Sequence, residues 1–296
     1  MKISFMRKDQ QMLLKLQEHL NSSQLQQLES LRKSICDIGK VCVAYSGGID
    51  SSLIATIAQE QLGHNAIAVT GVSASLAPHL LKEAREQAKW IGIIHQECKT
   101  NELQDPNYFQ NPIDRCFACK KELHSHIQKI ADNFNEAQII DGVNLDDISD
   151  HRPGITAARL AGVRSPLAEL QINKDSIRTI SKALGLPWWD KPAQPCLASR
   201  FPYGESITIK QLQKVANGEK WLIDNGFPNV RVRVHGLSAR IEIPMDEIDS
   251  FIMKVNRQKL IEYFSCLGFT SISLDLEGLI SGKLNRNIGN QKDNYS

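Results

Sequence analysis

The sequence predicts an α/β protein with a parallel sheet, followed by a smaller α+β domain. From residue 41 to about residue 185, short apolar runs alternate with segments that have helical apolar spacing. This alternation is typical of a parallel sheet with helical crossovers. After residue 204 the order changes to helix, hairpin, helix and strand. A chain of 296 residues has room for about two domains, in agreement with this change.

The elements are predicted in chain order from these patterns. An amphipathic helix pair, packing on the body or on a neighbour, is expected over residues 13–20 and 25–35. The strands of the first domain are expected at 41–45, 66–72, 93–98 and 138–144, where short apolar runs suit a buried sheet. Its helices are expected at 53–63, 77–92, 122–134, 155–162 and 174–185. The second domain is expected to contain a helix at 208–226, strands at 230–236 and 239–244, one or two helices over 246–268 and a strand at 271–278.

The change of pattern defines the predicted domains. We expect an N-terminal helical extension (1–35), an α/β domain (36–203), an α+β domain (204–285) and a tail (286–296). A loop over residues 187–204 precedes the second boundary, and its four prolines argue against a continuous element.

Composition excludes several classes of protein. Hydrophobic residues make up 42% and charged residues 23%, as in soluble globular proteins. The net charge of +2 is too small to indicate a nucleic-acid partner. No apolar run approaches the ~18 residues of a membrane span, and the N-terminus becomes polar too soon for a signal peptide. We therefore expect a cytoplasmic protein without membrane contact.

The seven cysteines do not suggest a disulfide framework, because their number is odd and no secretory signal precedes them. Four of them are assigned no function: Cys36, Cys42, Cys98 and Cys266. The other three lie in distinctive motifs. Cys116 and Cys119 form a C-x-x-C within Asp114–Leu123, just before a predicted helix, and Cys196 lies in the proline-rich loop.

The segment Ser46–Ser52 (SGGIDSS) follows a buried strand and opens a helix. Two glycines allow a tight turn, and the helix start offers free N–H groups to an anion. Asp50 suits such a site only if it binds a Mg²⁺ ion that is shared with phosphate. The sequence SGG alone would fit an ordinary strand-to-helix turn that is capped by Ser or Asp. The complete SGGxDS motif between a strand and a helix favours a phosphate site.

The stretch AYSGGIDSS resembles the loop of the PP-loop ATP pyrophosphatases. The resemblance implies a fold of the adenine-nucleotide α-hydrolase type and cleavage of ATP between its α and β phosphates, with Mg²⁺ on Asp50. The implied ATP-binding residues are Ser46, Gly47, Gly48, Asp50, Ser51 and Ser52.

Further motifs narrow this resemblance. The two cysteine motifs, together with DHRPG (150–154), VRVRVH (230–235) and LEGLISGKLN (276–285), resemble the LarE family of ATP-dependent sulfur transferases over residues 35–285. That family adenylates a carboxylate of pyridinium-3,5-biscarboxylic acid mononucleotide and converts it to a thiocarboxylate. The resemblance implies a small nucleotide substrate and a homo-oligomer with contacts through the C-terminal domain.

The family has two sulfur sources. One branch sacrifices a cysteine, which falls at Pro195 here, one place before Cys196. The other holds a [4Fe-4S] cluster on three cysteines, and Cys116, Cys119 and Cys196 match it. With Asp50, these are the implied catalytic residues. Cys196 acting alone, as a sacrificial or persulfide-carrying thiol, is the main alternative. A zinc site completed by His124 or His126, or a redox C-x-x-C, is another.

The remaining predicted site residues bind substrate or phosphate. Arg200, Arg231 and Arg233 carry forked donors that suit phosphate. In VRVRV both arginines fall on one strand face, which could also be a solvated face. Ser199, Glu219 and Glu242 match family positions near that site. Asp150 and Arg152 either order the ATP-side loop or form a simple helix N-cap or ion pair. The alternative functions are a PP-loop tRNA thiolase and a nucleotide-binding regulator without catalysis.

Overall fold

The computed structural model describes residues 19–148, 153–280 and 282–286, which divide into two compact units. The N-terminal unit comprises the described residues up to Ser73, Leu80–Glu102 and the described part of Asp114–Gln194. The C-terminal unit comprises Ala74–His79, Leu103–Ile113 and the described residues from Pro195 onward. Each unit is described by itself.

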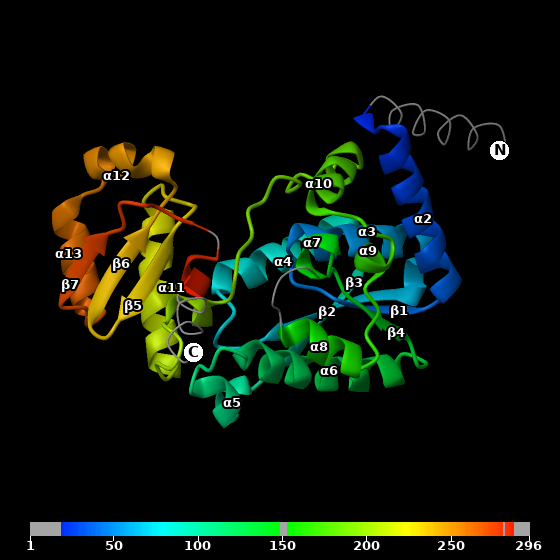
Figure 1. The fold of residues 1–296 in the computed structure, drawn as a ribbon, viewed down its shortest axis with the longest axis horizontal. Helices are drawn as coiled ribbons and strands as arrows, with labels where there is room; N and C mark the ends of the chain where they lie inside the picture. The colour runs from blue at the N-terminus through cyan, green and yellow to red at the C-terminus, as the bar shows by residue number, and fades with distance from the viewer. Residues whose placement is uncertain (1–18, 149–152, 281, 287–296) are drawn as a thin grey trace, which may run out of the picture. The chain divides into compact units, whose positions relative to one another are not determined.

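The N-terminal unit is built on a four-stranded parallel sheet in the order β3-β2-β1-β4 (Figure 1). The strands are β1 (Val41–Ala44), β2 (Ala66–Val72), β3 (Ile94–Lys99) and β4 (Gln138–Ile140). Val41 pairs with Ala66 on one side and with Gln138 on the other, so β1 is central. The predicted α/β class is confirmed.

The last strand is shorter than the predicted 138–144. After Ile140 the chain leaves β1, and the Asp141 N–H donates to the carbonyl of Arg164 at 3.0 Å. The residues that follow turn toward the start of the first crossover helix instead of extending the sheet. This early exit matters for the site described below.

Helices cover both faces of this sheet (Figure 1). Val41 and Val43 face a core cluster with α2 (Ser22–Ile38), α3 (Ile49–Leu62), α4 (Pro78–Ile91) and α10 (Lys174–Ala183), whereas Cys42 faces α6 (Arg115–Asn133) and α8 (Pro153–Leu160). Two short helices also belong to the N-terminal unit, α7 (Leu145–Ile148) and α9 (Pro166–Glu169), whereas the short helix α5 (Pro106–Phe109) belongs to the C-terminal unit. No helix in the described ranges is long and apolar enough to cross a bilayer.

Helix α2 is part of the core of the N-terminal unit. Its side chains Leu28, Leu31 and Ile35 are fully buried in the same cluster as β1. Asn21 caps the helix by accepting the Gln24 N–H at 2.9 Å, in a reciprocal capping box. The predicted helix at 13–20 lies almost wholly outside the described residues, as does the predicted tail after Arg286.

The C-terminal unit has a three-stranded sheet in the order β5-β6-β7. Strands β5 (Arg231–His235) and β6 (Ser238–Glu242) form an antiparallel hairpin, and β7 (Ser271–Leu274) runs parallel to β6. Helix α11 (Ile209–Asp224) precedes the hairpin. The predicted helical stretch 246–268 divides into α12 (Ile248–Lys254) and α13 (Arg257–Cys266), because Asn256 caps a new helix by accepting the Lys259 N–H at 3.0 Å.

The division between units does not follow one point in the sequence. The sequence places the boundary near residue 204, whereas the C-terminal unit also takes the loop from Pro195 and two earlier segments. Backbone hydrogen bonds explain this: Leu197 N–H donates to Ser75 O at 2.9 Å, and Gly204 N–H donates to Asn111 O at 2.8 Å. Contacts between distant segments of this kind leave no signal in local apolar spacing.

We expect Leu31→Ala to destabilise the protein by about 2 to 5 kcal/mol, because it opens a cavity in the core. Lys33→Ala, which truncates an exposed residue of the same helix, is the control. Thermal and urea unfolding measure both variants. Equal stability of the two would show that α2 is a dispensable extension.

Candidate functional site

The loop Ser46–Ser52 joins β1 to α3, as predicted, and its own serines hold it together. Ser51 Oγ accepts the Ser46 N–H at 3.2 Å and lies 3.0 Å from Ser46 Oγ. Ser46 Oγ in turn accepts the Gly48 N–H at 3.3 Å. The turn is thereby shaped before any ligand binds, and the positive end of the 14-residue helix α3 lies directly behind it.

Two glycines allow close backbone approach at this loop. Gly47 has φ +68°, and a Cβ there would lie 3.0 Å from the Cβ of Ala84. Gly142 follows β4, and a Cβ there would lie 2.6 Å from the Ser51 nitrogen. Sequence analysis missed Gly142; its only signal was a glycine inside the predicted strand 138–144. These contacts form a cradle with no space for side chains, which suits a phosphate group.

Asp50 lies at the first turn of α3 and forms an ion pair with Lys174. Lys174 Nζ donates to both carboxylate oxygens of Asp50, at 2.7 and 2.5 Å, and Asn144 Nδ2 lies 3.3 Å from one of them. The Asp50 side chain is 23% exposed, so a hard cation can reach it. Carboxylate oxygen is the ligand that Mg²⁺ prefers, so this residue fits the predicted metal role. Sequence analysis did not find Lys174 or Asn144.

Ser52 stabilises the phosphate loop through buried hydrogen bonds. It is fully buried, and its hydroxyl donates to Gln87 Oε1 at 3.1 Å, while its N–H donates to Gly48 O at 2.9 Å. The Tyr45 hydroxyl donates to the same Gln87 oxygen at 3.1 Å, and burial raises the pKa of Tyr45 to about 12. The structure therefore places Ser52 in a neutral hydrogen-bond network beneath the predicted phosphate site.

Asp141, at the end of β4, completes this edge of the sheet. Burial raises the pKa of Asp141, and hydrogen bonds from Ser165 Oγ at 2.7 Å and Val143 N–H at 3.1 Å partly offset the effect, as does the nearby charge of Lys120. The bonds to Asp141 fix the turn that carries Gly142. Lys120 follows Cys119 directly, so the charge beside the C-x-x-C acts on the carboxyl group at the end of β4.

Cys116 and Cys119 lie inside α6, not before a helix as the sequence suggested. The helix begins at Arg115, so the two thiols occupy its first two turns, on one face at a spacing of three residues. Cys116 is exposed and Cys119 is partly exposed. By contrast, Cys42 and Cys98 are buried, and burial raises the pKa of Cys42 to about 12. The C-x-x-C thiols are thus accessible, and the core thiols are held protonated.

The two histidines of the zinc hypothesis occupy different environments. His124 is buried, with neither ring nitrogen hydrogen-bonded within the described chain, and burial lowers its pKa to about 4. His126 lies 3.7 Å from Glu122. Among the described residues, no three His, Cys, Asp or Glu side chains are grouped as a metal site, and this holds for Cys116, Cys119 and Cys196 as well. The zinc and cluster hypotheses therefore both stay predictions.

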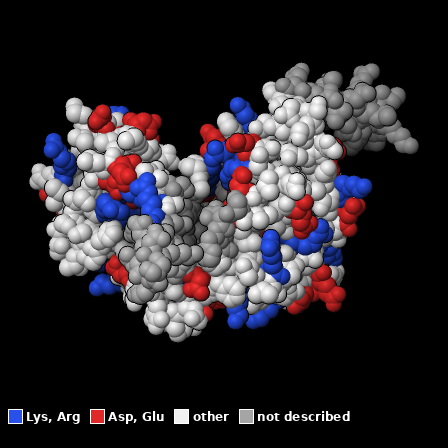
Figure 2. Space-filling model, viewed as in Figure 1, with Lys and Arg blue, Asp and Glu red and all other residues white. Residues whose placement is uncertain are grey.

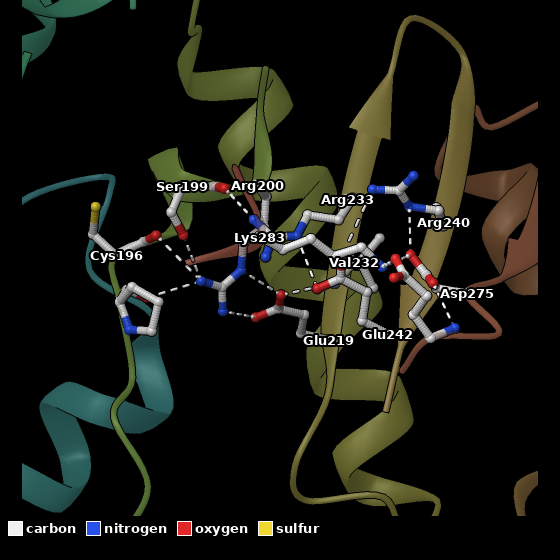
Figure 3. A network of polar contacts seen from close by, with 12 residues as sticks. Cys196, Ser199, Arg200, Glu219, Val232, Arg233, Arg240, Glu242, Asp275 and Lys283 are labelled. Carbon is white, nitrogen blue, oxygen red and sulfur yellow. Dashed lines mark hydrogen bonds and ion pairs between the residues drawn. The ribbon is translucent and has the colours of Figure 1, made fainter. Parts of the chain in front are cut away.

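Cys196 belongs to the C-terminal unit, where Arg200 holds its loop (Figure 3). Arg200 Nη1 donates to Pro195 O at 2.9 Å, to Cys196 O at 3.3 Å and to Ser199 Oγ at 2.9 Å. The Cys196 side chain is exposed. One buried guanidinium therefore fixes the backbone on which this thiol is presented.

A buried, bidentate ion pair anchors Arg200 to α11. Its Nε and Nη2 donate to the two oxygens of Glu219 at 2.7 and 3.0 Å, and both side chains are 3% exposed. The Val232 N–H donates to Glu219 Oε1 at 2.9 Å, which ties the pair to β5. Gly218 makes this packing possible, because a Cβ there would lie 3.2 Å from the ring of Phe264.

Arg233 forms a second buried pair in the same network (Figure 3). Its Nε donates to Glu242 Oε2 at 3.0 Å, and its Nη1 donates to the carbonyl of Ser199 at 2.5 Å. Arg231 is also buried, so the hypothesis of a solvated arginine face is wrong. Burial, together with the neighbouring charges of Arg200 and Arg233, lowers the pKa of Arg231 to about 10, although Glu242 and Glu219 partly offset the effect.

The C-terminal unit therefore gathers arginine side chains. The buried guanidiniums of Arg200, Arg231 and Arg233 lie together with the buried carboxylates of Glu219 and Glu242. Phosphate and carboxylate suit guanidinium geometry, so this group of arginines is a candidate anion site. The structure gathers seven predicted residues in this unit: Cys196, Ser199, Arg200, Glu219, Arg231, Arg233 and Glu242.

The other predicted residues belong to the N-terminal unit. They are Ser46, Gly47, Gly48, Asp50, Ser51 and Ser52 at the phosphate loop, and Cys116 and Cys119 on α6. Pro153 and Gly154 of the DHRPG motif open α8, whereas Asp150 and Arg152 lie outside the described residues. The predicted roles of all these residues stay predictions.

A family model and several relatives match this chain. Residues 28–116 match the asparagine synthase family model, which covers β1, the phosphate loop and the following elements up to Cys116. With the parallel sheet and the SGGIDS turn, this match defines a PP-loop ATP pyrophosphatase.

Full-length relatives define the family. The chain is 52% identical to an uncharacterized Synechocystis protein, over 88% of this chain and 97% of that protein. It is 37% identical to the pyridinium-3,5-bisthiocarboxylic acid mononucleotide synthase of Lactiplantibacillus plantarum, over 86% of this chain and 92% of that enzyme. It is also 29% identical to an uncharacterized Methanocaldococcus jannaschii protein, over 80% and 90%. The chain belongs to the LarE family.

We expect Glu219→Gln to lower the stability of the C-terminal unit by about 3 to 5 kcal/mol, because a buried guanidinium loses its counter-charge. The control is Lys220→Met, which breaks an exposed pair with Asp224 and should change stability by less than about 1 kcal/mol. Thermal unfolding measures both. If Glu219→Gln leaves the stability unchanged, the buried Arg200 guanidinium does not depend on this counter-charge.

Proposed function

We propose that this protein is an ATP-dependent sulfurtransferase that converts pyridinium-3,5-biscarboxylic acid mononucleotide to its thiocarboxylate. The observation that carries the proposal is the 37% identity to a pyridinium-3,5-bisthiocarboxylic acid mononucleotide synthase along 92% of that enzyme. The reaction requires activation by ATP and recognition of an anionic nucleotide. The phosphate loop (Ser46–Ser52) suits the first requirement, and the arginine cluster (Arg200, Arg231 and Arg233) suits the second.

ATP and Mg²⁺ activate the substrate carboxylate in the first step. A carboxylate oxygen attacks the α-phosphorus of ATP, the bond to the β-phosphate oxygen breaks, and pyrophosphate leaves. A free carboxylate is a poor acyl donor, whereas an acyl-adenylate carries AMP as a good leaving group. The phosphate loop would hold the departing pyrophosphate. Asp50 would hold the Mg²⁺ ion, which supplies positive charge at the reacting phosphates when bound. Lys174, now paired with Asp50, would supply a further positive charge beside them.

Sulfur replaces AMP in the second step. A sulfur nucleophile attacks the activated carbonyl carbon, and AMP leaves with the oxygen that came from the carboxylate. Arg231, with Arg200 and Arg233 beside it, binds the phosphate or a carboxylate of the mononucleotide. Ser199, Glu219 and Glu242 keep these guanidiniums in place and complete the substrate site.

The sulfur source is proposed to be a [4Fe-4S] cluster on Cys116, Cys119 and Cys196. Three thiolates leave one iron open to an external sulfide, and this is the chemistry that the cluster supplies when bound. Two observations support these donors: their side chains are exposed or partly exposed, and Cys116 and Cys119 share one helix face. Proline stands at the position of the sacrificial cysteine. Sulfur from Cys196 alone is the alternative.

A small nucleotide fits the surface charge better than tRNA does. On the face shown in Figure 2, lysine and arginine are interspersed with aspartate and glutamate, without a continuous basic area. The Lactiplantibacillus plantarum relative is named for a mononucleotide product. The expected homo-oligomer and the cytoplasmic location stay predictions.

Given Mg-ATP and the biscarboxylate mononucleotide, the enzyme should release AMP and pyrophosphate and no ADP. Asp50→Asn should reduce turnover by about 100-fold or more, because it removes the metal-binding charge at the reacting phosphates. Asp224→Asn, which neutralises an exposed carboxylate, is the control. Nucleotide chromatography identifies the products. Formation of ADP and orthophosphate would overturn the assignment of the reaction.

Anaerobically purified protein should bind iron and sulfide through three cysteines. Alanine in place of Cys116, Cys119 or Cys196 should each abolish sulfur transfer and the visible absorption of the cluster, while adenylation persists. Cys36→Ala, at another exposed cysteine, is the control. If iron-free protein instead contains dehydroalanine at position 196 after turnover, the cluster hypothesis is wrong and Cys196 itself is the sulfur source.

A further inference from the structure

The ammonium of Lys191 lies against the phosphate loop. Its Nζ donates to the carbonyl oxygen of Gly47 at 3.3 Å and to Glu83 Oε2 at 2.5 Å. The Lys191 side chain is 16% exposed, whereas Glu83 on α4 is 42% exposed. An ammonium group has three N–H donors, and these contacts use two of them. The third is available to a ligand at the loop.

The contact acts on the residue that shapes the turn. Gly47 has φ +68°. Glycine populates positive and negative φ about equally, so the residue alone does not fix this conformation. The carbonyl of Gly47 and the N–H of Gly48 belong to one peptide plane, and that N–H donates to Ser46 Oγ at 3.3 Å. A charged donor on the carbonyl therefore selects one orientation of the whole peptide, and with it the direction of the Gly48 N–H.

We propose that Lys191 is a positioning residue for ATP: it fixes the Gly47–Gly48 peptide and adds positive charge beside the pyrophosphate group held by the loop. Glu83 orients the ammonium from α4. The inference rests on the proposed function only in that ATP occupies this loop. It assigns a role to the proline-rich segment 187–194, which sequence analysis treated as a connection.

A purely structural role makes a different forecast. In that case Lys191 ties its segment to α4 through Glu83, and the bond to Gly47 is incidental. Glu83→Gln then harms the protein as much as loss of the ammonium does. If the ammonium acts on the loop itself, Glu83→Gln leaves most of the effect intact, because Lys191 and its bond to Gly47 remain.

The test is the affinity of the full-length protein for Mg-ATP, measured by titration calorimetry without the second substrate. Lys191→Met should weaken binding on the order of 10- to 100-fold, since it removes a charged donor. Lys191→Gln should also weaken it, and Lys191→Arg should restore binding to within a few-fold of the wild type. Glu83→Gln should stay close to the wild type. Lys182→Met is the matched control, because the Lys182 ammonium on α10 lies 4.5 Å from the ring centroid of Trp189, in the same segment as Lys191.

Three outcomes decide the inference. Unchanged affinity in both Lys191→Met and Lys191→Gln would overturn it. So would a loss in Glu83→Gln as large as that in Lys191→Met, or an equal loss in Lys182→Met. Wild-type protein that binds Mg-ATP but forms no AMP with the mononucleotide would overturn the proposed function and leave this role of Lys191 standing.

Discussion

Backbone approaches backbone at the phosphate loop with no room for a side chain between them, and the N-terminal unit is organised around this constraint. Gly142 lies against the Ser51 nitrogen, and Gly47 lies against Ala84. The approach of Gly142 requires β4 to end after Ile140, so that the chain can turn toward α3. Buried Asp141 holds that turn through Ser165 and Val143. A short strand, a buried acid and a glycine are thus consequences of one anion-binding turn.

The C-terminal unit meets a different constraint, which is to keep several guanidiniums buried side by side. Glu219 pairs with Arg200 and Glu242 pairs with Arg233, while burial and the neighbouring guanidiniums lower the pKa of Arg231. Because Arg200 also holds the carbonyls of Pro195 and Cys196, the charge network and the cysteine loop form one structure. Any change in the Arg200 guanidinium therefore acts on the backbone that carries the Cys196 thiol.

Local pattern carried the prediction of the parallel sheet, the phosphate loop and the arginine strand, because each depends on neighbours in sequence. It failed where distant segments decide the outcome. Lys174 and Asn144 meet Asp50 from far along the chain. The loop from Pro195 joins the C-terminal unit through bonds to Ser75 and Asn111 that apolar spacing does not reveal. The C-x-x-C lies inside α6 because this helix begins at Arg115, whereas the regular apolar spacing that predicted it begins at residue 122.

The central claim is that the carboxylate itself attacks the α-phosphate of ATP. The most direct test uses substrate labelled with ¹⁸O in its carboxylates, with mass spectrometry of the AMP and pyrophosphate that are released. The account predicts that each AMP carries one labelled oxygen, because AMP departs with the carboxylate oxygen when sulfur attacks, and that pyrophosphate carries none. Label in pyrophosphate, or AMP without label while thiocarboxylate accumulates, would contradict activation by adenylation.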